Sequence, residues 1–146
     1  MEGFLLLQTN LDAALISAYR ETDYRVTESP AFTLRVDTFC PELQAFLRSK
    51  KATCAAFLTA CNPFSQSLSD SENKKLQLSL ASELTHRSLD YLQGIGQHPS
   101  NHWPGEPSFL VLELALEAAK TLGKLYQQNA LIWSDSDGIP RLVLLR

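Results

Sequence analysis

The sequence predicts an α/β (α+β) fold in which a mixed β-sheet of about five to six strands is flanked by about four helices. Two observations lead to this prediction. Short apolar runs alternate with longer segments of helical periodicity, and two pairs of short strands are separated by turn residues, as in hairpins. The chain has 146 residues, which fits a single domain over residues 1–146. Because strand–helix–strand units occur together with hairpins, we expect a mixed sheet.

The first part of the chain predicts a helix, a hairpin and a second helix. Asn10 can cap the first helix, whose apolar residues recur at helical spacing. Residues 24–26 and 32–36 are candidate strands on either side of Pro30, and we expect them to pair. Pro41 suits the first turn of the second helix, where its missing N–H leaves no hydrogen bond unmade.

The middle of the chain predicts a central strand followed by a capped helix. The apolar run from Cys54 to Ala60 has the composition of a strand that is buried on both faces. Asn62-Pro63 ends this run as a turn. Ser69 and Glu72 match the capping box, in which a hydroxyl precedes an acid by three residues, so a helix is expected to begin here.

The remaining segments predict further strands, one helix and a terminal hairpin. Gly94 and Gly96 are expected to end a short strand at a bulge or tight turn, since a dinucleotide fingerprint needs a third glycine and a helix start. Asn129 is a natural left-handed cap for the last helix. The expected elements are strands at 91–93 and 108–114, a helix at 117–127, and a hairpin formed by 130–133 and 141–145.

Composition and charge argue against several classes of protein. The net charge is −3 and the charges are scattered, so we expect no binding to duplex nucleic acid. No run approaches the ~20 apolar residues that span a bilayer, and the first residues lack the basic start of a signal peptide. The three cysteines show no Cys-x-x-Cys spacing. We therefore expect a cytoplasmic protein with reduced thiols and no association with a membrane.

Polar residues at the end of the central run form the first candidate site. Thr59, Asn62 and Ser65 stand where the strand gives way to the turn. Amide and hydroxyl groups at a strand end can hold a polar ligand, and the following helix can offer free N–H groups to an anion. The alternative is that Asn62 starts a turn and Ser65 satisfies its backbone.

Glu106 and Ser108 form a second candidate site, just before a buried strand and close to Trp103. A carboxylate beside an indole loses water, which raises its pKa and suits acid–base chemistry. Glu106 is therefore the candidate catalytic residue if the protein is an enzyme, a question that the sequence leaves open. The alternative is an exposed carboxylate in a proline-rich loop. Gln128 would join this site if the strand ends converge.

Two histidines raise the question of a metal site. His98 and His102 have a His-x-x-x-His spacing but lie in a loop that contains proline and serine. Such a spacing places two side chains together on a helix, not in a loop. We therefore predict no metal site, and the sequence leaves any cofactor unknown.

Several short motifs in this chain resemble a bacterial family catalogued only as a domain of unknown function, number three-two-nine-three. They are, in order, Thr59-Ala60-Cys61-Asn62-Pro63, Ser65, Glu72-Asn73, Gly94-Ile95-Gly96, Trp103-Pro104, Glu106-Pro107-Ser108-Phe109-Leu110, Gln128-Asn129-Ala130 and Trp133. The resemblance covers roughly residue 19 to the end, adds Asn73 to the candidate site, and implies no activity. Two positions depart from the expected pattern: Glu113 replaces a glycine, and Lys74-Lys75-Leu76 stands where an arginine is expected, for which lysine is an imperfect substitute.

The leading hypothesis is a polar small-ligand site at the strand ends. Asn62 and Gln128 would orient the ligand by amide hydrogen bonds, and Trp103 would stack on a flat ring, which suits a nucleotide-like ligand. The alternative is a non-catalytic protein–protein interaction module that uses the Trp103 loop or a sheet edge near Trp133, where another copy of the chain can pair to form a homo-oligomer. The full set of candidate site residues is Thr59, Asn62, Ser65, Asn73, Trp103, Glu106, Ser108 and Gln128.

Overall fold

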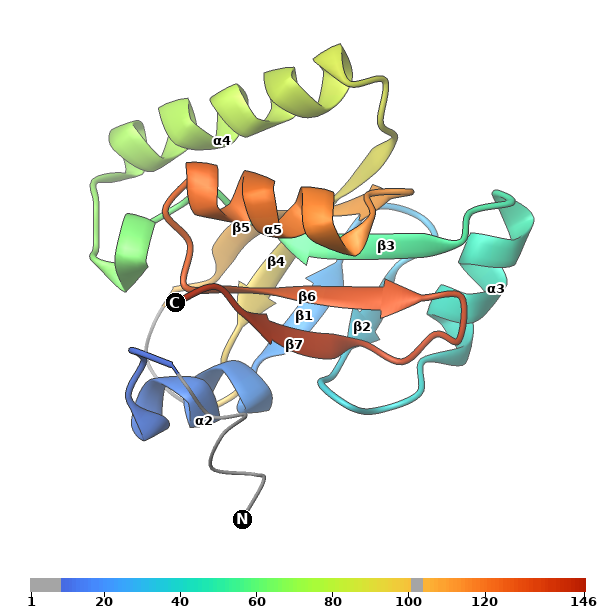
Figure 1. Cartoon of the computed structure of the whole chain (residues 1–146), viewed down its shortest axis with the longest axis horizontal. Coiled ribbons are helices and arrows are strands. Elements are labelled where there is room, and N and C mark those ends of the chain that lie inside the picture. Colours follow the sequence, from blue (N-terminus) through green and yellow to red (C-terminus); the bar gives the residue numbers. More distant parts are fainter. Residues whose placement is uncertain (1–8, 101–103) are drawn as a thin grey trace.

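The structure is a computed structural model that describes residues 9–100 and 104–146. Within these ranges it contains four α-helices, one short 3₁₀ turn and seven strands (Figure 1). The elements, in chain order, are α2 (Ala13–Glu21), β1 (Asp23–Val26), β2 (Phe32–Leu34), α3 (Pro41–Ser49), β3 (Cys54–Leu58), η1 (Pro63–Ser65), α4 (Asp70–His86), β4 (Tyr91–Gln97), β5 (Glu106–Leu112), α5 (Leu116–Leu125), β6 (Ala130–Asp135) and β7 (Arg141–Leu144).

The seven strands form one sheet in the order β2-β1-β4-β5-β3-β6-β7. Every pair of neighbouring strands is antiparallel, so the expectation of a mixed sheet with five or six strands is corrected. The physical reason lies in the crossovers. Helix α4 joins β3 to β4 and α5 joins β5 to β6, but each crossover skips one position of the sheet. The skipped position is filled by an antiparallel strand, which is the split βαβ arrangement.

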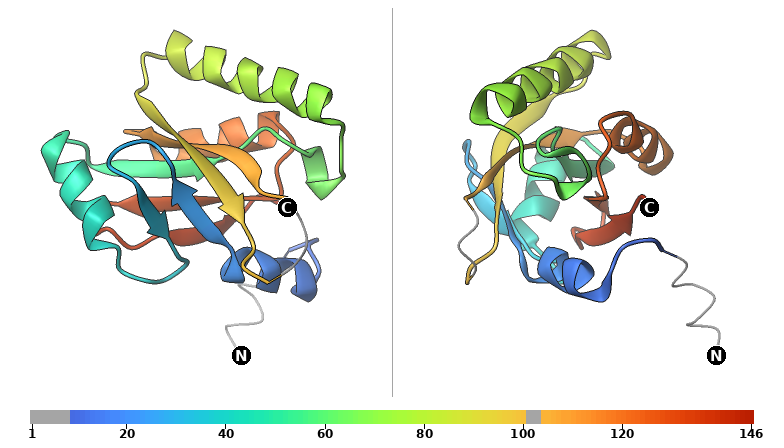
Figure 2. Two further views of the ribbon diagram at one scale, coloured as in Figure 1. Left: turned by 180° about the vertical axis from the view of Figure 1, so that it is seen from behind. Right: turned by 90° about the vertical axis from the view of Figure 1, so that its left-hand side faces the viewer.

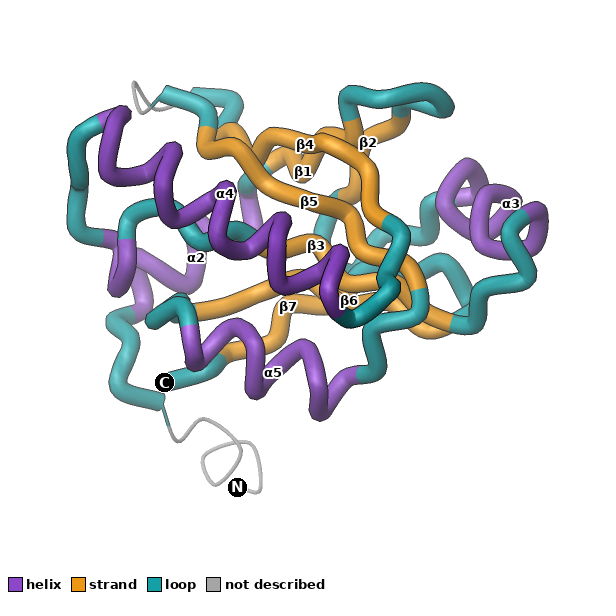
Figure 3. Tube along the Cα trace, turned by 90° about the horizontal axis from the view of Figure 1, so that it is seen from above, coloured by secondary structure: helices purple, strands orange, loops and turns teal. Residues whose placement is uncertain are grey.

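The two crossover helices cover the same face of the sheet, as Figures 1 and 3 show. On that face Ala56 and Val111 of the sheet pack with Leu80 and Leu84 of α4 and with Leu122 of α5. Because successive side chains of a strand point to opposite faces, the neighbouring sheet residues belong to a second cluster. All five residues of β3 are buried between the two clusters, which confirms it as the predicted central strand.

The second face of the sheet is concave, because the sheet curls around it (Figure 2). Helix α3 closes one end of this face with Leu43 and Leu47, which pack with Phe57 and Leu110. Helix α2 lies at the other end, below β1 and β7 in Figure 1. No residue of α2 is fully buried, so this helix borders the concave face without filling it.

Several local predictions are confirmed. The hairpins β1–β2 and β6–β7 form as expected. Pro41 is the first residue of α3. Ser69 and Glu72 make the reciprocal bonds of a capping box at the start of α4. The N-terminal helix differs, because Asp12 rather than Asn10 is its cap, with Asp12 Oδ1 accepting from the Leu15 amide at 2.8 Å.

Two predicted chain breaks lie elsewhere than expected. Gly94 and Gly96 do not end a strand; they lie inside β4, paired with Ser108 and Glu106. A Cβ at Gly94 would lie 2.7 Å from the Phe57 ring, so this glycine serves close packing rather than a turn. At the end of α5 the left-handed residue is Gln127, with φ of 55°.

Candidate functional site

The antiparallel order brings distant segments of the chain together at one end of the strands. β3 and β4 end there, whereas β5 and β6 begin there. The residues just beyond these strand ends therefore meet, although they are far apart in sequence. Asn62 follows β3, Glu106 opens β5, and Gln128 precedes β6.

A cavity of about 250 Å³ lies at these strand ends, between α2 and the concave face of the sheet. Its walls combine apolar side chains of the sheet with polar side chains from the loops and from α2. The apolar lining includes Phe57, Leu58, Leu131, Ile132 and Leu142, and the polar lining includes Tyr19, Thr22, Tyr24, Thr59, Asn62, Ser65, Ser67, His98, Glu106, Ser108, Gln128 and Asn129.

One polar contact in the cavity joins Asn62 to Glu106. Asn62 Nδ2 donates to Glu106 Oε2 at 2.8 Å. The other side of the Asn62 amide is also occupied, because its Oδ1 accepts from the Leu68 backbone N–H at 3.0 Å and from Asn73 Nδ2 at 2.7 Å. Asn73 returns the contact by accepting from the Asn62 backbone N–H at 2.8 Å. Asn62 is thereby fixed in orientation and presents one N–H to the carboxylate.

Glu106 is a partly buried carboxyl group at the start of β5. Burial raises its pKa above the ordinary value of 4.5, and the hydrogen bond from Asn62 offsets part of that increase. Oε2 accepts this bond, and no hydrogen-bond donor to Oε1 is found among the described residues. Glu106 lies within strand β5, and Trp103, the residue expected to desolvate it, lies outside the described residues.

The loop between β3 and α4 is held in an uncommon backbone conformation. Asn62, Phe64 and Ser65 all have positive φ, at 48°, 54° and 61°. Each such residue costs about 1–2 kcal/mol relative to ordinary backbone, so the surrounding contacts must hold the loop in place. One of them runs from the Phe64 amide to the Gln127 carbonyl at 2.7 Å. The loop therefore presents Asn62 and Ser65 on a rigid frame.

Ser65 belongs to a second polar cluster on the α2 side of the cavity. Its Oγ lies 2.8 Å from the Tyr19 hydroxyl. Asn129 Nδ2 donates to Ser65 Oγ at 3.0 Å and to the Tyr19 hydroxyl at 3.2 Å. Asn129 is 4% exposed, and its Oδ1 accepts from Arg146 at 3.2 Å. This cluster ties α2 to the strand ends and closes one side of the cavity.

Other predicted site residues line the cavity but use their polar atoms within the protein. Thr59 Oγ1 donates to the Pro107 carbonyl at 2.6 Å, and Ser108 Oγ donates to the Glu106 carbonyl at 3.0 Å. Gln128 Nε2 donates to the Cys61 carbonyl at 3.0 Å. Asn73 does not line the cavity and acts only through Asn62. Trp103 lies outside the described residues.

The cavity residues that the sequence did not indicate as site residues include Tyr19, Tyr24 and Asn129. Tyr19 and Tyr24 come from α2 and β1, and Asn129 was assigned to a helix cap. The Tyr24 hydroxyl donates to the Tyr19 carbonyl at 2.6 Å, and burial raises the pKa of Tyr24 far above its ordinary value, so it stays neutral. No local pattern marks these residues, because their role depends on packing between segments distant in sequence.

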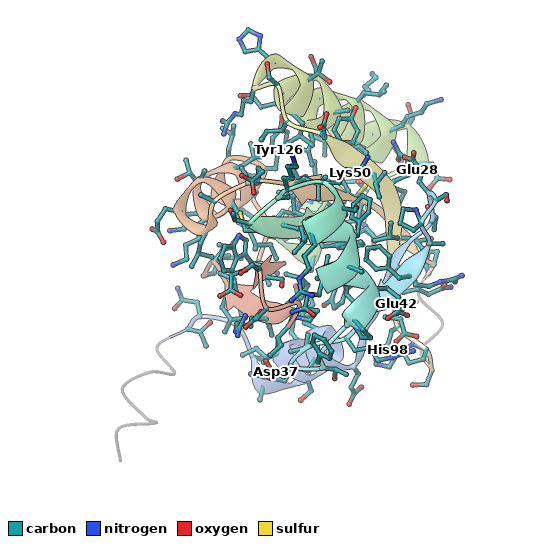
Figure 4. All side chains as sticks on the ribbon, turned by 90° about the vertical axis from the view of Figure 1, so that its right-hand side faces the viewer. Glu28, Asp37, Glu42, Lys50, His98 and Tyr126 are labelled. Carbon is teal, nitrogen blue, oxygen red and sulfur yellow. The ribbon has the colours of Figure 1, made fainter. Side chains whose placement is uncertain are left out.

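His98 lies beside α2 at the rim of the cavity (Figure 4). Its Nε2 is 2.8 Å from Glu21 Oε2. In the described part of the chain, no group of three or more His, Cys, Asp or Glu side chains is placed to hold a metal ion. His102, the other histidine of the predicted pair, lies outside the described residues. Burial raises the pKa of the Cys40, Cys54 and Cys61 thiols, and all three are free.

Comparison with known protein families gives a match. A family model described as "protein of unknown function (DUF3293)" matches residues 58–131, which is half of the chain. The chain belongs to this family. Neither the curated proteins nor the solved structures contain a match to the chain. Among residues 9–100 and 104–146, no helix combines the length and apolar character needed to cross a membrane.

The DUF3293 segment covers only part of the cavity wall. It includes Asn62, Glu106 and Asn129 but neither Tyr19 nor Tyr24. α2 and β1 therefore complete a cavity whose strand-end half lies within the family match.

The two departures from the expected motifs have different structural settings. Glu113, where a glycine was expected, has φ of 61°, a conformation that glycine adopts without strain. Its carboxylate accepts from the backbone N–H and the hydroxyl of Thr53, which compensates in part. Lys74 and Lys75 are exposed on α4 and do not line the cavity.

Proposed function

We propose that this protein binds a small polar ligand in the cavity at the strand ends. The observation that supports this proposal most strongly is the partly buried Glu106 carboxylate in a cavity that also contains neutral hydroxyl and amide groups. Ligand sites typically combine apolar walls with placed polar groups, and this cavity has both kinds of lining residue. The rigid loop at Asn62 means that little order has to be gained when a ligand binds.

The size and charge of the cavity limit the ligand. Its volume of about 250 Å³ is below the roughly 300–1,000 Å³ of sites for drug-sized molecules. The occupant is therefore a small molecule, or one ring of a larger one. If the ligand is nucleotide-like, the cavity suits its base better than its phosphates. The capping box already uses the first turn of α4, and the described cavity lining has no Lys or Arg to bind a phosphate.

Binding, rather than a defined reaction, is the function that these contacts support. Glu106 is the group that would exchange a proton with a bound substrate, since its raised pKa suits acid–base chemistry. The free, buried cysteines agree with the reducing interior of a bacterial cell, and we retain a cytoplasmic location as part of the proposal.

The alternative function is pairing with another protein along a sheet edge. β7 is an edge strand whose four residues are only partly buried, and an unpaired edge can accept another strand. Trp133 does not belong to this edge; it lies in β6, and its Nε1 donates to the Leu114 carbonyl at 3.0 Å. Light scattering coupled to gel filtration tests this alternative, which predicts a dimer that is lost in Val143→Pro.

The ligand proposal is tested by a fragment screen with ligand-observed NMR on wild-type protein and on Gly96→Leu. Gly96 lines the cavity, and a Cβ there meets only ordinary contacts, the nearest at 3.8 Å from Tyr24. A leucine at this position fills the cavity without forcing the backbone apart, and Gly96→Ala is the matched control. We expect fragments that bind wild type and Gly96→Ala but not Gly96→Leu. Fragments that bind all three proteins equally would contradict the proposal.

A further inference from the structure

The charges around the cavity are unbalanced. Glu106 is the acidic residue of its described lining, and none of the described lining residues is Lys or Arg. Arg146 is nearby in the polar cluster, but its guanidinium bonds to Asn129 Oδ1 and lies 4.2 Å from the centre of the Phe64 ring. His98, the other titratable group besides the tyrosines, already contacts Glu21 at the rim.

A desolvated carboxylate is costly unless a charge or several hydrogen bonds compensate it. Glu106 receives one hydrogen bond, from Asn62, on Oε2. Its Oε1 has no donor among the described residues. The hydroxyls of the opposite cluster bond to one another, since Tyr19, Ser65 and Asn129 are mutually paired. Oε1 is not among the buried polar atoms that lack a partner, so it is an accessible acceptor for solvent or a ligand at the wall of a small cavity.

We propose that the ligand presents a protonated nitrogen, as an amine or an amidinium-like group, to Oε1 of Glu106, with its apolar part against Phe57 and Ile132. This inference rests on the proposed function and names the chemical class of the ligand. A charged N–H donor makes a shorter and stronger hydrogen bond to a carboxylate than a neutral donor does. The aromatic rings of Tyr24 and Phe57, whose centroids are 5.5 Å apart, border the same space and also attract a cation.

An anionic ligand meets the opposite situation. It would bring a second negative charge next to Glu106, and the described lining offers no cation in return. Like charges in a desolvated site repel strongly. A neutral ligand avoids this repulsion but leaves the Glu106 charge uncompensated. The expected order of affinity is therefore cation, neutral molecule, anion.

Three probes of matched shape test this order at neutral pH: benzamidine, benzamide and benzoate. They share one ring and differ in the charge of the group attached to it. Dissociation constants are measured by protein-observed NMR titration. We expect benzamidine to bind at least about tenfold more tightly than benzamide, and benzoate to bind more weakly than both.

Two variants locate the effect. Glu106→Gln keeps the shape of the side chain and the acceptor for Asn62 but removes the charge. The affinity of this variant for benzamidine should therefore fall to its affinity for benzamide. Glu117→Gln, which removes an exposed carboxylate on α5, should leave all three affinities unchanged.

The possible results separate this inference from the proposed function. If benzamide binds as tightly as benzamidine and Gly96→Leu abolishes both, the cavity is a ligand site but the preference for a cation is wrong. If benzoate binds most tightly, the inference is also wrong. If none of the three probes binds wild type while screened fragments of other chemistry do, the inference fails and the proposed function stands. If nothing binds in the cavity, both fail.

Discussion

Asn62 and Glu106 are 44 positions apart in the chain, and Asn62 Nδ2 donates a 2.8 Å hydrogen bond to Glu106 Oε2. This contact joins the strained loop after β3 to the first residue of β5. Two opposing influences act on the Glu106 carboxyl: burial raises its pKa, and the hydrogen bond from Asn62 lowers it. The first two predictions separate these effects.

The first prediction concerns stability against pH. Because the pKa of Glu106 is raised by folding, the folded protein holds this proton more tightly than the unfolded chain does. The resulting stabilisation is fully present below the unfolded pKa, near 4.5, and is lost as pH rises through the higher folded pKa. The unfolding free energy of wild type minus that of Glu106→Gln should therefore decrease between about pH 4 and pH 7. Urea unfolding of both proteins across this pH range measures the difference in unfolding free energy. A difference that stays constant or increases with pH contradicts the account.

The second prediction concerns the Asn62 side chain. Asn62→Gly keeps a residue that tolerates the positive φ of 48° but removes the donor to Glu106. The pKa of Glu106 should then rise further, since the one interaction that lowers it is lost. Carbon-detected NMR titration of the Glu106 carboxyl measures this pKa directly in both proteins. An unchanged or lower pKa in Asn62→Gly would show that the contact is not made in solution.

The two glycines of β4 were predicted as a chain break, and their different surroundings explain why sequence alone misplaced them. A lone glycine in a strand signals a bulge as readily as a close contact. A Cβ at Gly94 meets the Arg25 carbonyl and the Phe57 ring, both at 2.7 Å, whereas a Cβ at Gly96 faces the cavity. Only the packing of β1 and β3 against β4 distinguishes the two positions.

The third prediction follows from this difference. Gly94→Ala should destabilise the protein by about 1–3 kcal/mol, because backbone and ring atoms must shift. Gly96→Ala should change stability by less than about 1 kcal/mol, since its Cβ makes ordinary contacts and alanine loses less conformational freedom on folding. Chemical denaturation of the two variants, which differ by two positions in one strand, gives the comparison. Equal losses would contradict the described packing of β4.

The fourth prediction concerns Glu113, which has φ of 61° where the family resemblance suggested a glycine. Glu113→Gly and Glu113→Ala both remove the carboxylate that bonds Thr53, but only alanine keeps a Cβ in the left-handed conformation. Glu113→Gly should be the more stable of the two by about 1 kcal/mol. Thermal unfolding of the pair measures the difference, and equal stabilities would mean that this backbone conformation is not adopted.

Much of the local structure could be predicted from the sequence because it depends on neighbouring residues. The capping box at Ser69 and the proline that begins α3 are local signals of this kind. The burial of β3 is visible in its unbroken apolar run. The antiparallel sheet is not visible, because strand order depends on which strand enters the gap left by each crossover, and periodicity carries no such information.

The candidate site divides in the same way. Asn62 and Glu106 were identifiable because polar residues bordered strongly apolar strands. Tyr19 and Asn129 were not, since an apolar helical face and a helix end each gave a sufficient local explanation. The pairing of Asn129 with Ser65 and Tyr19 depends on α2 lying across the strand ends, which only the folded chain determines.

The most direct test of the account is where a bound small molecule perturbs the protein. A two-dimensional amide NMR spectrum is recorded with and without benzamidine, or with the tightest fragment from the screen. We predict that the largest shifts fall on Gly96, Glu106 and Asn129 around the cavity, and that they vanish in Gly96→Leu. Shifts centred instead on Leu76, Leu125 and Tyr126, which border a second, more open hollow between α4 and α5, would contradict a ligand site at the strand ends.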